Sequence, residues 1–352
     1  MQLQRCIISP NRFRVWDQLP CWFRAYGNRK TRTIPLPSST SIRTLYTVHS
    51  ATLASPFRYH PLDVLDDASL DSFRENCFVP ERPAILPRGY FRGIPAFERW
   101  FQAADSSSFF SSGNNISRLK VEYLHKHGAD VFVPLELTEL PPYPANGNNA
   151  EDDDHSFRRF HAPLSVFLQW IQQTTHESPM RLYLAQCQLL DLPQALRDDL
   201  PTPSLVSQAG KGDVYDTNIW MGLPPTYTPL HRDPNPNLFV QLAGQKRVRL
   251  LTPDDGLALF AFVRRKLRRA GNREAAVFRG EEMMQGKERE FLDQVVWNDS
   301  DDANGPDSSS QEKNGYEAQL GPGDGLFIPK GWWHSIKGVG KEVTASANWW
   351  FR

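Results

Sequence analysis

The stretch that decides the predicted fold is Thr228-Pro-Leu-His231-Arg-Asp233, taken together with Gly331-Trp-Trp-His334 much further along the chain. His231 and Asp233 are two residues apart, so on an extended strand their side chains lie on one face. Both can bind one metal ion, and His334 from a distant strand would complete a set of two imidazoles and one carboxylate. Such a set leaves coordination positions open and suits non-haem Fe(II) that must also bind a cosubstrate and O2.

The residues before His334 strengthen this prediction. They read Gly323-Asp-Gly-Leu-Phe-Ile-Pro329-Lys-Gly331-Trp-Trp-His334, which is a Gly turn, an apolar strand, a Pro-x-Gly turn and a further strand. This pattern predicts a hairpin that presents His334. A His-x-Asp pair alone is weak, since about one is expected by chance from nine His and forty acidic residues. The segment around His334 resembles the second conserved motif of the cupin superfamily, except that no Asn follows the His.

The amino-acid composition limits the classes of protein to which this chain can belong. The chain has 352 residues, no formal net charge and 12% aromatic residues, which permits one large or two small domains with a β-rich core. The neutral balance argues against a dedicated nucleic-acid binder. Four irregularly spaced cysteines (Cys6, Cys21, Cys77 and Cys187) predict neither a disulfide framework nor a Cys-based zinc site. No apolar stretch is long enough to predict a membrane span.

Residues 1–60 differ from the rest of the chain. They are rich in Arg, Ser and Thr and contain a single acid, Asp17. This composition is typical of a mitochondrial presequence. The alternative is a basic, disordered tail that stays attached, on a protein of the cytoplasm or nucleus. In either case we expect these residues to lie outside the fold.

The remaining residues divide into two predicted parts. Residues 61–179 are expected to form a mainly helical part that packs on the core, with helices at 69–78, 95–101, 117–127 and 163–173. Residues 180–352 are expected to form the core, with strands at 180–186, 216–222, 316–320, 326–329, 332–336 and 343–351 and a hairpin at 239–251. Residues 254–315 interrupt this core with a basic helix at 260–273 and an acidic, Ser-rich stretch that is predicted to be disordered. The basic residues of 263–269 fit a solvated helix face or a surface for phosphates or acidic partners.

An Fe(II) centre that oxidises an unactivated C–H bond needs two extra electrons to split O2, and 2-oxoglutarate is the usual donor. Its far carboxylate needs a buried cation and hydroxyl groups. Lys246, Thr228 and Tyr183 are candidates on predicted strands. Asn237 and Asn348 are lone amides on otherwise apolar strands.

These motifs together resemble the JmjC hydroxylases, including the asparaginyl hydroxylase that inhibits hypoxia-inducible factor. The motifs are Tyr183-Leu-x-Gln, Thr228-x-x-His231-x-Asp233, Asn237-x-x-x-Gln241-x-x-Gly244-x-Lys246, Gly323-Asp, Ile328-Pro, Trp332-Trp-His334 and Asn348-x-Trp350. The resemblance covers residues 180–352 and more faintly the chain from residue 70. It implies a mainly β fold with flanking helices around a double-stranded β-helix, the jelly roll of cupins.

The resemblance also implies the site. The Fe(II) ligands correspond to His231, Asp233 and His334. The 2-oxoglutarate carboxylate would be held by Lys246, Thr228 and Tyr183, while Asn237 and Asn348 would line the cosubstrate and O2 side of the metal.

The implied function is an Fe(II)- and 2-oxoglutarate-dependent dioxygenase that hydroxylates a side chain of a protein substrate. Demethylation of N-methyl-lysine and hydroxylation of a tRNA base use the same chemistry, and the basic residues 263–269 are the only support for nucleic acid. A non-catalytic, metal-binding cupin is the alternative outside the enzymes. The named hydroxylase dimerises through helices beyond its last core strand, whereas this chain ends at Arg352, so the oligomeric state stays open. Residues 254–315 differ from the family, so substrate identity is not carried over.

Overall fold

The computed structural model describes residues 57–102, 119–139, 157–175, 177–267, 284, 286–298 and 313–352. The strands are β1 (Phe57–Pro61), β2 (Ala84–Ile85), β3 (Phe132–Glu139), β4 (Phe157–Pro163), β5 (Met180–Gln188), β6 (Val214–Gly222), β7 (Thr226–Arg232), β8 (Asn237–Ala243), β9 (Gln245–Leu251), β10 (Lys313–Leu320), β11 (Gly325–Ile328), β12 (Trp333–Val339) and β13 (Thr344–Phe351). The α-helices are α1 (Leu70–Phe73), α2 (Ala96–Trp100), α3 (Val121–Gly128), α4 (Leu164–Gln173), α5 (Gln194–Arg197), α6 (Ser204–Gln208), α7 (Pro253–Lys266) and α8 (Gly286–Trp297). A π-helical turn, η1 (Arg74–Phe78), continues α1, and short 3-10 helices lie at η2 (Tyr90–Gly93) and η4 (Leu189–Asp191).

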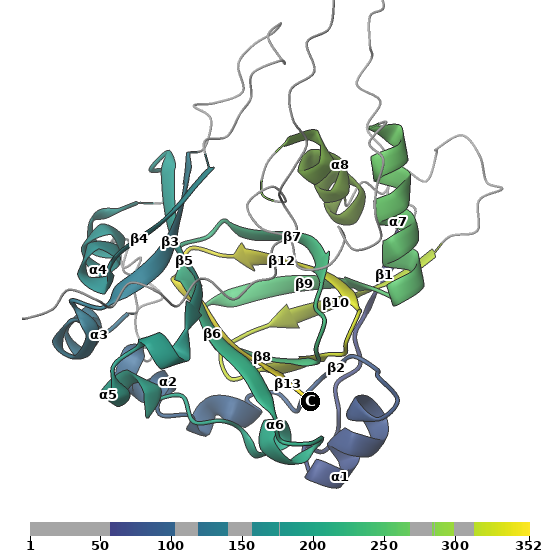
Figure 1. Cartoon of the computed structure of the whole chain (residues 1–352), viewed down its shortest axis with the longest axis horizontal. Helices are drawn as coiled ribbons and strands as arrows, with labels where there is room; N and C mark the ends of the chain where they lie inside the picture. Colours follow the sequence, from purple (N-terminus) through teal and green to yellow (C-terminus); the bar gives the residue numbers. More distant parts are fainter. Residues whose placement is uncertain are drawn as a thin grey trace, which may run out of the picture. The chain divides into compact units, whose positions relative to one another are not determined.

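The strands from β6 to β13 alternate between two sheets that face each other, except that β9 and β10 are neighbours in the same sheet (Figure 1). One sheet contains β11-β8-β13-β6 and is extended by β2 at one edge and by β5-β3-β4 at the other. The other contains β10-β9-β12-β7 and is extended by β1, which runs parallel to β10. Pairing within the core strands is antiparallel throughout. This alternation is that of a jelly roll, and the predicted double-stranded β-helix with flanking helices is confirmed.

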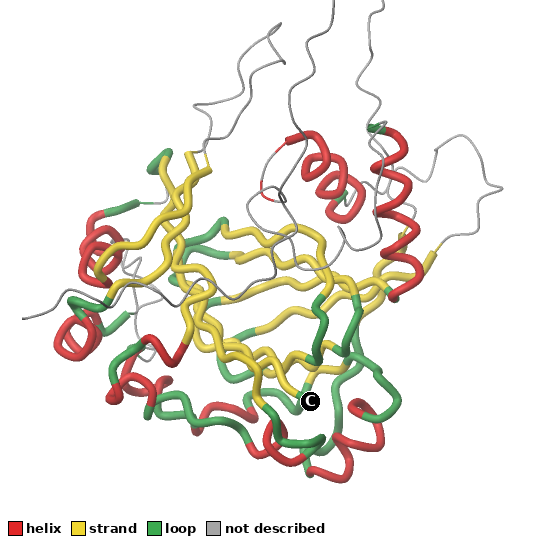
Figure 2. The backbone as a smooth tube through the Cα atoms, viewed as in Figure 1, coloured by secondary structure: helices red, strands yellow, loops and turns green. Residues whose placement is uncertain are grey.

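Both sheets bury residues on their two faces, because helices cover the outer ones (Figure 2). Between the sheets, Phe239, Val248 and Leu250 belong to one apolar cluster. The outer face of the larger sheet belongs to a second cluster, in which Trp349 and Phe167 of α4 are fully buried. The third cluster joins α7 and α8 to the outer face of the smaller sheet.

That third cluster explains why α7 contains a glycine. Its members include Leu259 of α7, Val296 of α8 and Trp333 of β12. A Cβ atom on Gly256 would lie 2.1 Å from the Trp333 ring, so the helix can approach the sheet this closely only at a residue without a side chain.

Both predicted hairpins are wrong. β8 pairs with β11 and β13, whereas β9 pairs with β10 and β12 in the opposite sheet. Gly244, with φ of +63°, turns the chain from one sheet to the other, and a Cβ there would lie 2.6 Å from the Val343 carbonyl oxygen. β11 and β12 are likewise in opposite sheets. A Gly turn shows only that the chain reverses direction. Here the two strands that flank each turn belong to opposite sheets, whose apolar inner faces pack against each other across the interior.

The N-terminal boundary is also corrected. β1 begins at Phe57, so residues 57–60, predicted as tail, belong to the folded part. Residues 1–56, 103–118 and 140–156 lie outside the described residues. The predicted helices at 69–78, 95–101, 117–127 and 163–173 correspond to α1 with η1, α2, α3 and α4. Within the parts that the structure describes, no helix is long and apolar enough to cross a membrane.

The segment 254–315 contains more structure than predicted. The basic helix begins at Pro253, where Thr252 caps its N-terminus, and is described as far as Lys266. The helix α8 was not predicted at all; Leu292 and Val296 on its apolar face join the cluster that contains Leu230 of β7. The acidic stretch 299–312, predicted to be disordered, lies outside the described residues.

Candidate metal centre

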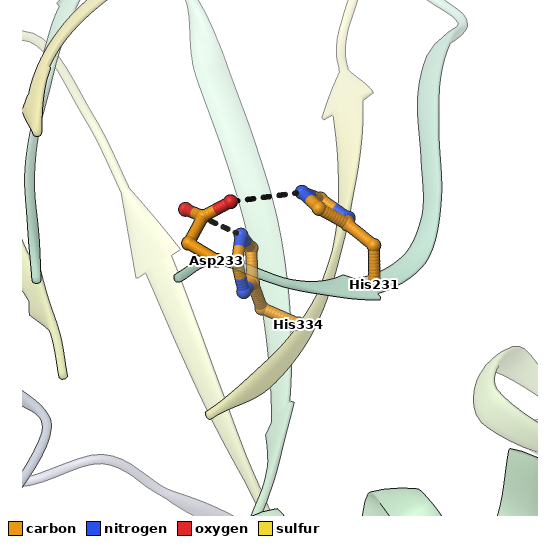
Figure 3. Close-up of side chains that lie close together, drawn as sticks. All are labelled: His231, Asp233 and His334. Carbon is orange, nitrogen blue, oxygen red and sulfur yellow. Dashed lines mark ion pairs between the residues drawn. The ribbon is translucent and has the colours of Figure 1, made fainter. Parts of the chain in front are cut away.

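The three predicted metal ligands lie together at one end of the paired strands β7 and β12. His231 and His334 are direct partners in the antiparallel register, and their ring centroids are 4.2 Å apart. Asp233 follows β7 immediately. Its Oδ1 atom is 3.8 Å from His231 Nε2 and its Oδ2 atom is 3.7 Å from His334 Nε2 (Figure 3). One ligand atom from each residue can be chosen so that all lie within 4.8 Å of one another.

The backbone fixes which ring nitrogen faces this point. His231 Nδ1 lies 2.8 Å from the carbonyl oxygen of Pro229, and His334 Nδ1 lies 3.1 Å from that of Trp332. A carbonyl oxygen only accepts, so Nδ1 donates and Nε2 keeps its lone pair. Burial, with added repulsion from His231, lowers the pKa of His334 to about 4. This ring is therefore neutral near pH 7, as a metal ligand must be.

The carboxylate of Asp233 is held by two donors. Its Oδ2 accepts hydrogen bonds from Asn237 Nδ2 at 3.0 Å and from Trp350 Nε1 at 2.8 Å. Its Oδ1 is buried and has no hydrogen-bond partner among the described residues. A buried carboxylate oxygen beside two imidazole lone pairs is unfavourable alone, and a divalent cation would satisfy all of them. The residues present therefore fit a metal, and two nitrogens with one oxygen are the donor set of a non-haem Fe(II) centre.

Lys246 lies inside the fold on β9 and is only 3% exposed. Its Nζ donates to Ser346 Oγ at 2.7 Å and lies 3.4 Å from Tyr183 Oη and 5.2 Å from the centre of the Phe239 ring. Burial lowers the pKa of Lys246 to about 7. Within the described ranges no carboxylate pairs with this group, so an anionic ligand is the partner that its position favours.

The two predicted hydroxyl groups differ in their placement. Tyr183 of β5 lies against Gly222, where a Cβ would come within 2.6 Å of its ring, and burial raises the pKa of its phenol. Tyr183 thus stays a neutral donor near Lys246, and the Thr226 hydroxyl bonds to it. Thr228 lies on β7 opposite Ile336, and the structure shows no hydrogen bond from its hydroxyl to Lys246 or Tyr183.

The two predicted amides lie on inner strand positions. Asn237 contacts the ligand carboxylate itself, and Asn348 Oδ1 accepts a hydrogen bond from Trp220 Nε1 at 2.8 Å. Sequence reasoning missed Ser346, which contacts Lys246, and gave no role to Trp350, which contacts Asp233. They stand two residues before and two after Asn348, so the period-two alternation of β13 was the signal that could have found them.

Comparison with known proteins agrees with this geometry. The cupin-like domain family matches residues 70–352. The chain belongs to that family. It is similar to the Jumonji C domain-containing protein 5 of Drosophila melanogaster, with 24% identity over 81% of this chain and 59% of that protein. It is 30% identical to lysine-specific demethylase 8 of Danio rerio over 80% of this chain and 56% of that protein. It is 25% identical to lysine-specific demethylase JMJ30 of Arabidopsis thaliana over 80% of this chain and 53% of that protein.

The resemblance to JmjC oxygenases, which depend on Fe(II) and 2-oxoglutarate, is thereby confirmed. The chain spans only about half the length of the curated relatives it matches. The likeness to the asparaginyl hydroxylase in particular stays a prediction.

Proposed function

We propose that this chain hydroxylates a side chain of a protein substrate, with Fe(II) held by His231, Asp233 and His334 and with 2-oxoglutarate held by Lys246 and Tyr183. The observation that carries the proposal is the pairing of two features inside one jelly roll. The first is the set of possible metal ligands, His231, Asp233 and His334. The second is Lys246, which is buried and has no carboxylate partner among the described residues. Strand β13 connects them, since Ser346 bonds to Lys246 and Trp350 bonds to Asp233.

Each part has a defined role in this chemistry. Bound Fe(II) and 2-oxoglutarate would together supply the activation of O2 and the electrons for oxygen insertion into a C–H bond. The Nδ1–carbonyl bonds of His231 and His334 hold both rings with Nε2 toward the metal. Asn237 and Trp350 fix Asp233 through Oδ2, so that Oδ1 is left for the metal. Fixed donors of this kind typically raise metal affinity or activity about 10- to 100-fold.

Demethylation of N-methyl-lysine is the second candidate, because several relatives are named lysine-specific demethylases. Both reactions start with hydroxylation of a C–H bond. They diverge afterwards, because a hydroxylated N-methyl group collapses to release formaldehyde whereas a hydroxylated side-chain carbon is retained.

A tRNA substrate and a role without catalysis have less support. Arg264 of the basic segment is 3.5 Å from Glu288 of α8, and Lys266 lies over Phe291 of the same helix. These side chains are thus engaged in helix packing, which weakens the argument for a tRNA surface. A metal-binding cupin without catalysis gives no reason for burying Lys246 without a carboxylate.

The proposal is tested by following succinate. Purified full-length chain with Fe(II), ascorbate, 2-oxoglutarate and O2 should form succinate slowly even without substrate, and His231→Ala should abolish this. Lys246→Met should raise the 2-oxoglutarate requirement while metal binding persists. Lys337→Met is the matched control. Lys337 lies on β12, next to the strand of Lys246, but its Nζ contacts helix α8, 3.2 Å from Asp293 Oδ1. Absence of succinate from the unaltered chain, or equal effects of both lysine substitutions, would refute the proposal.

The two candidate reactions are then separated with substrates. We expect mass spectrometry of a proteome treated with the active chain to show an added oxygen on a side chain, with no formaldehyde. Formaldehyde release from N-methyl-lysine peptides would support demethylation instead.

We also propose, from composition alone, that residues 1–60 direct the chain to mitochondria. A fluorescent fusion of residues 1–60 should then co-localise with a mitochondrial dye, and a diffuse cytoplasmic or nuclear signal would overturn this.

A further inference from the structure

The strand that carries His231 contains a β-bulge directly before that residue. From Thr228 to His231, β7 advances by three positions. Over the same part of the ladder β12 advances by only two, from Ile336 to His334. The strand β7 therefore has one extra residue here, beside Pro229. It is the edge strand of its sheet, where bulges and proline are both tolerated because the ladder is already incomplete.

The bulge determines which side chains of β7 face the interior. In a regular strand, side chains an odd number of positions apart point to opposite faces. Yet Leu230 belongs to the apolar cluster on the outer face, and Tyr227, three positions earlier, packs against the same cluster. On the inner side, Thr226 bonds to Tyr183 although it is five positions from the inward-facing His231. The extra residue thus lets both ends of β7 contribute to one interior site.

Two backbone carbonyl groups at the bulge accept hydrogen bonds from side chains. The Pro229 carbonyl oxygen is the partner of His231 Nδ1, at 2.8 Å, and this bond turns Nε2 of the ring toward the metal site. The Thr228 carbonyl oxygen accepts from Ser335 Oγ at 2.9 Å. Ser335 lies on β12 at the position where the ladder is irregular. The conformation of the bulge therefore sets the orientation of the His231 ring, and Ser335 is bonded to that bulge.

The Ser335 hydroxyl is itself oriented from outside the sheet. Ser335 is 0% exposed, and its Oγ accepts a hydrogen bond from Trp297 Nε1 at 2.9 Å. An indole nitrogen only donates, and a hydroxyl has a single hydrogen. Ser335 must therefore accept from Trp297 and donate to the Thr228 carbonyl. The two bonds form a chain with one direction, from indole to hydroxyl to bulge.

The indole of Trp297 is held in place at the end of α8. This helix lies over the outer face of the smaller sheet, and Trp297 is its last residue (Figure 1). Two cations flank the ring, with Lys337 Nζ at 4.6 Å and the guanidinium carbon of Arg249 at 4.8 Å from a ring centre. Arg249 also donates to the carbonyl oxygen of Val296 at 2.6 Å, which ties the end of the helix to β9.

We propose that Trp297 and Ser335 are positioning residues for the metal ligand His231, because they hold the bulge whose carbonyl group orients its ring. This inference rests on the proposed metal site. It goes beyond that site by making α8, a helix outside the barrel, part of what forms the centre. Without the hydroxyl, the Thr228 carbonyl and the Trp297 N–H would both be buried without this partner, which costs free energy. The bulge would then relax, and the His231 ring would lose its fixed direction.

The test measures Mn(II) binding to the full chain, without O2, by electron paramagnetic resonance. Ser335→Ala should weaken Mn(II) binding about 10-fold. It should also change the zero-field splitting of the bound ion, which depends on the geometry of the ligands. Trp297→Phe removes the N–H but keeps an aromatic ring, and should cause a smaller loss with the same change in the spectrum. Because Trp297 acts through Ser335, the double variant should match Ser335→Ala alone within about twofold.

The control is Val296→Ala, which trims the buried packing of α8 and leaves the bonds of Trp297 and Ser335 in place. It should lower the urea midpoint of unfolding but leave the Mn(II) affinity and spectrum unchanged. An equal loss of affinity in this variant would attribute the effect to helix packing and overturn the inference.

The other outcomes are equally decisive. If Ser335→Ala binds Mn(II) within about twofold of the unaltered chain, with the same spectrum, the bulge does not need the hydroxyl and the assignment is wrong. If the losses of the two single variants multiply in the double variant, Trp297 does not act through Ser335. Should Ser335→Ala fail to fold, unchanged affinity and spectrum in Trp297→Phe would refute the inference. Failure of the unaltered chain to bind Mn(II) would instead refute the proposed function itself.

Discussion

Removing the charge of Lys246 should change both stability and proton uptake, in directions that the structure fixes. Burial lowers the pKa of this lysine from 10.5 to about 7 in the ligand-free chain. Because the folded-state pKa lies below the unfolded one, the destabilisation is complete below pH 7 and is relieved as pH rises from 7 toward 10.5. The difference between these two pKa values corresponds to a destabilisation of the folded state by at most about 5 kcal/mol. Lys246→Met should therefore raise the free energy of unfolding by up to a few kcal/mol at pH 6, and by much less near pH 10.

Ligand binding should reverse this protonation. At pH 8 a group with a pKa near 7 is about nine-tenths neutral, so binding of a dicarboxylate that pairs with Lys246 should take up about 0.9 proton. Calorimetry of 2-oxoglutarate binding to the Mn(II)-loaded chain, without O2, measures this. The same titration in phosphate and in Tris, whose ionisation enthalpies differ, gives the number of protons from the difference in apparent enthalpy.

The control is Lys246→Met, in which the proton uptake should vanish while residual binding remains measurable at high ligand concentration. Urea unfolding at pH 6 and pH 10 checks the stability half of the prediction. Proton uptake near zero in the unaltered chain, or equal uptake in both proteins, would show that Lys246 is not the group that meets the anion.

Other predictions test the metal centre and the packing. His231→Ala should lower Mn(II) affinity by more than about 100-fold by electron paramagnetic resonance, and retention of tight binding would remove this ring from the ligand set. Trp350→Phe deletes a hydrogen-bond donor to the carboxylate of Asp233 and should weaken Mn(II) binding about 10-fold. The control is Trp349→Phe, which alters the neighbouring outward-facing indole and should leave Mn(II) binding unchanged. Equal effects of the two substitutions would argue against the role given to Trp350. Gly256→Ala should destabilise the chain by about 1–3 kcal/mol in urea, because overlap with Trp333 outweighs the gain of up to about 1 kcal/mol in helix propensity; a stabilised variant would mean that α7 moves away freely.

Local patterns in the sequence determined much of this protein. The spacing of His231 and Asp233 predicts a shared strand face, and they do converge with His334, because alternation along a strand is a property of the backbone itself. The short helix after Ser69 was equally predictable, since its cap bond reaches only to Ser72. Such features depend on residues a few positions apart.

Only the tertiary structure decided which segments become neighbours. The Gly244 turn looks like a hairpin in sequence, yet it carries the chain from one sheet to the other. Trp350 reaches Asp233, and Asn218 stands opposite Asn348, across more than a hundred residues of chain. The first contact follows from packing the two inner sheet faces against each other, and the second from the pairing of β6 with β13 within one sheet. That choice is made by the burial of whole faces, so no short stretch of the sequence contains it.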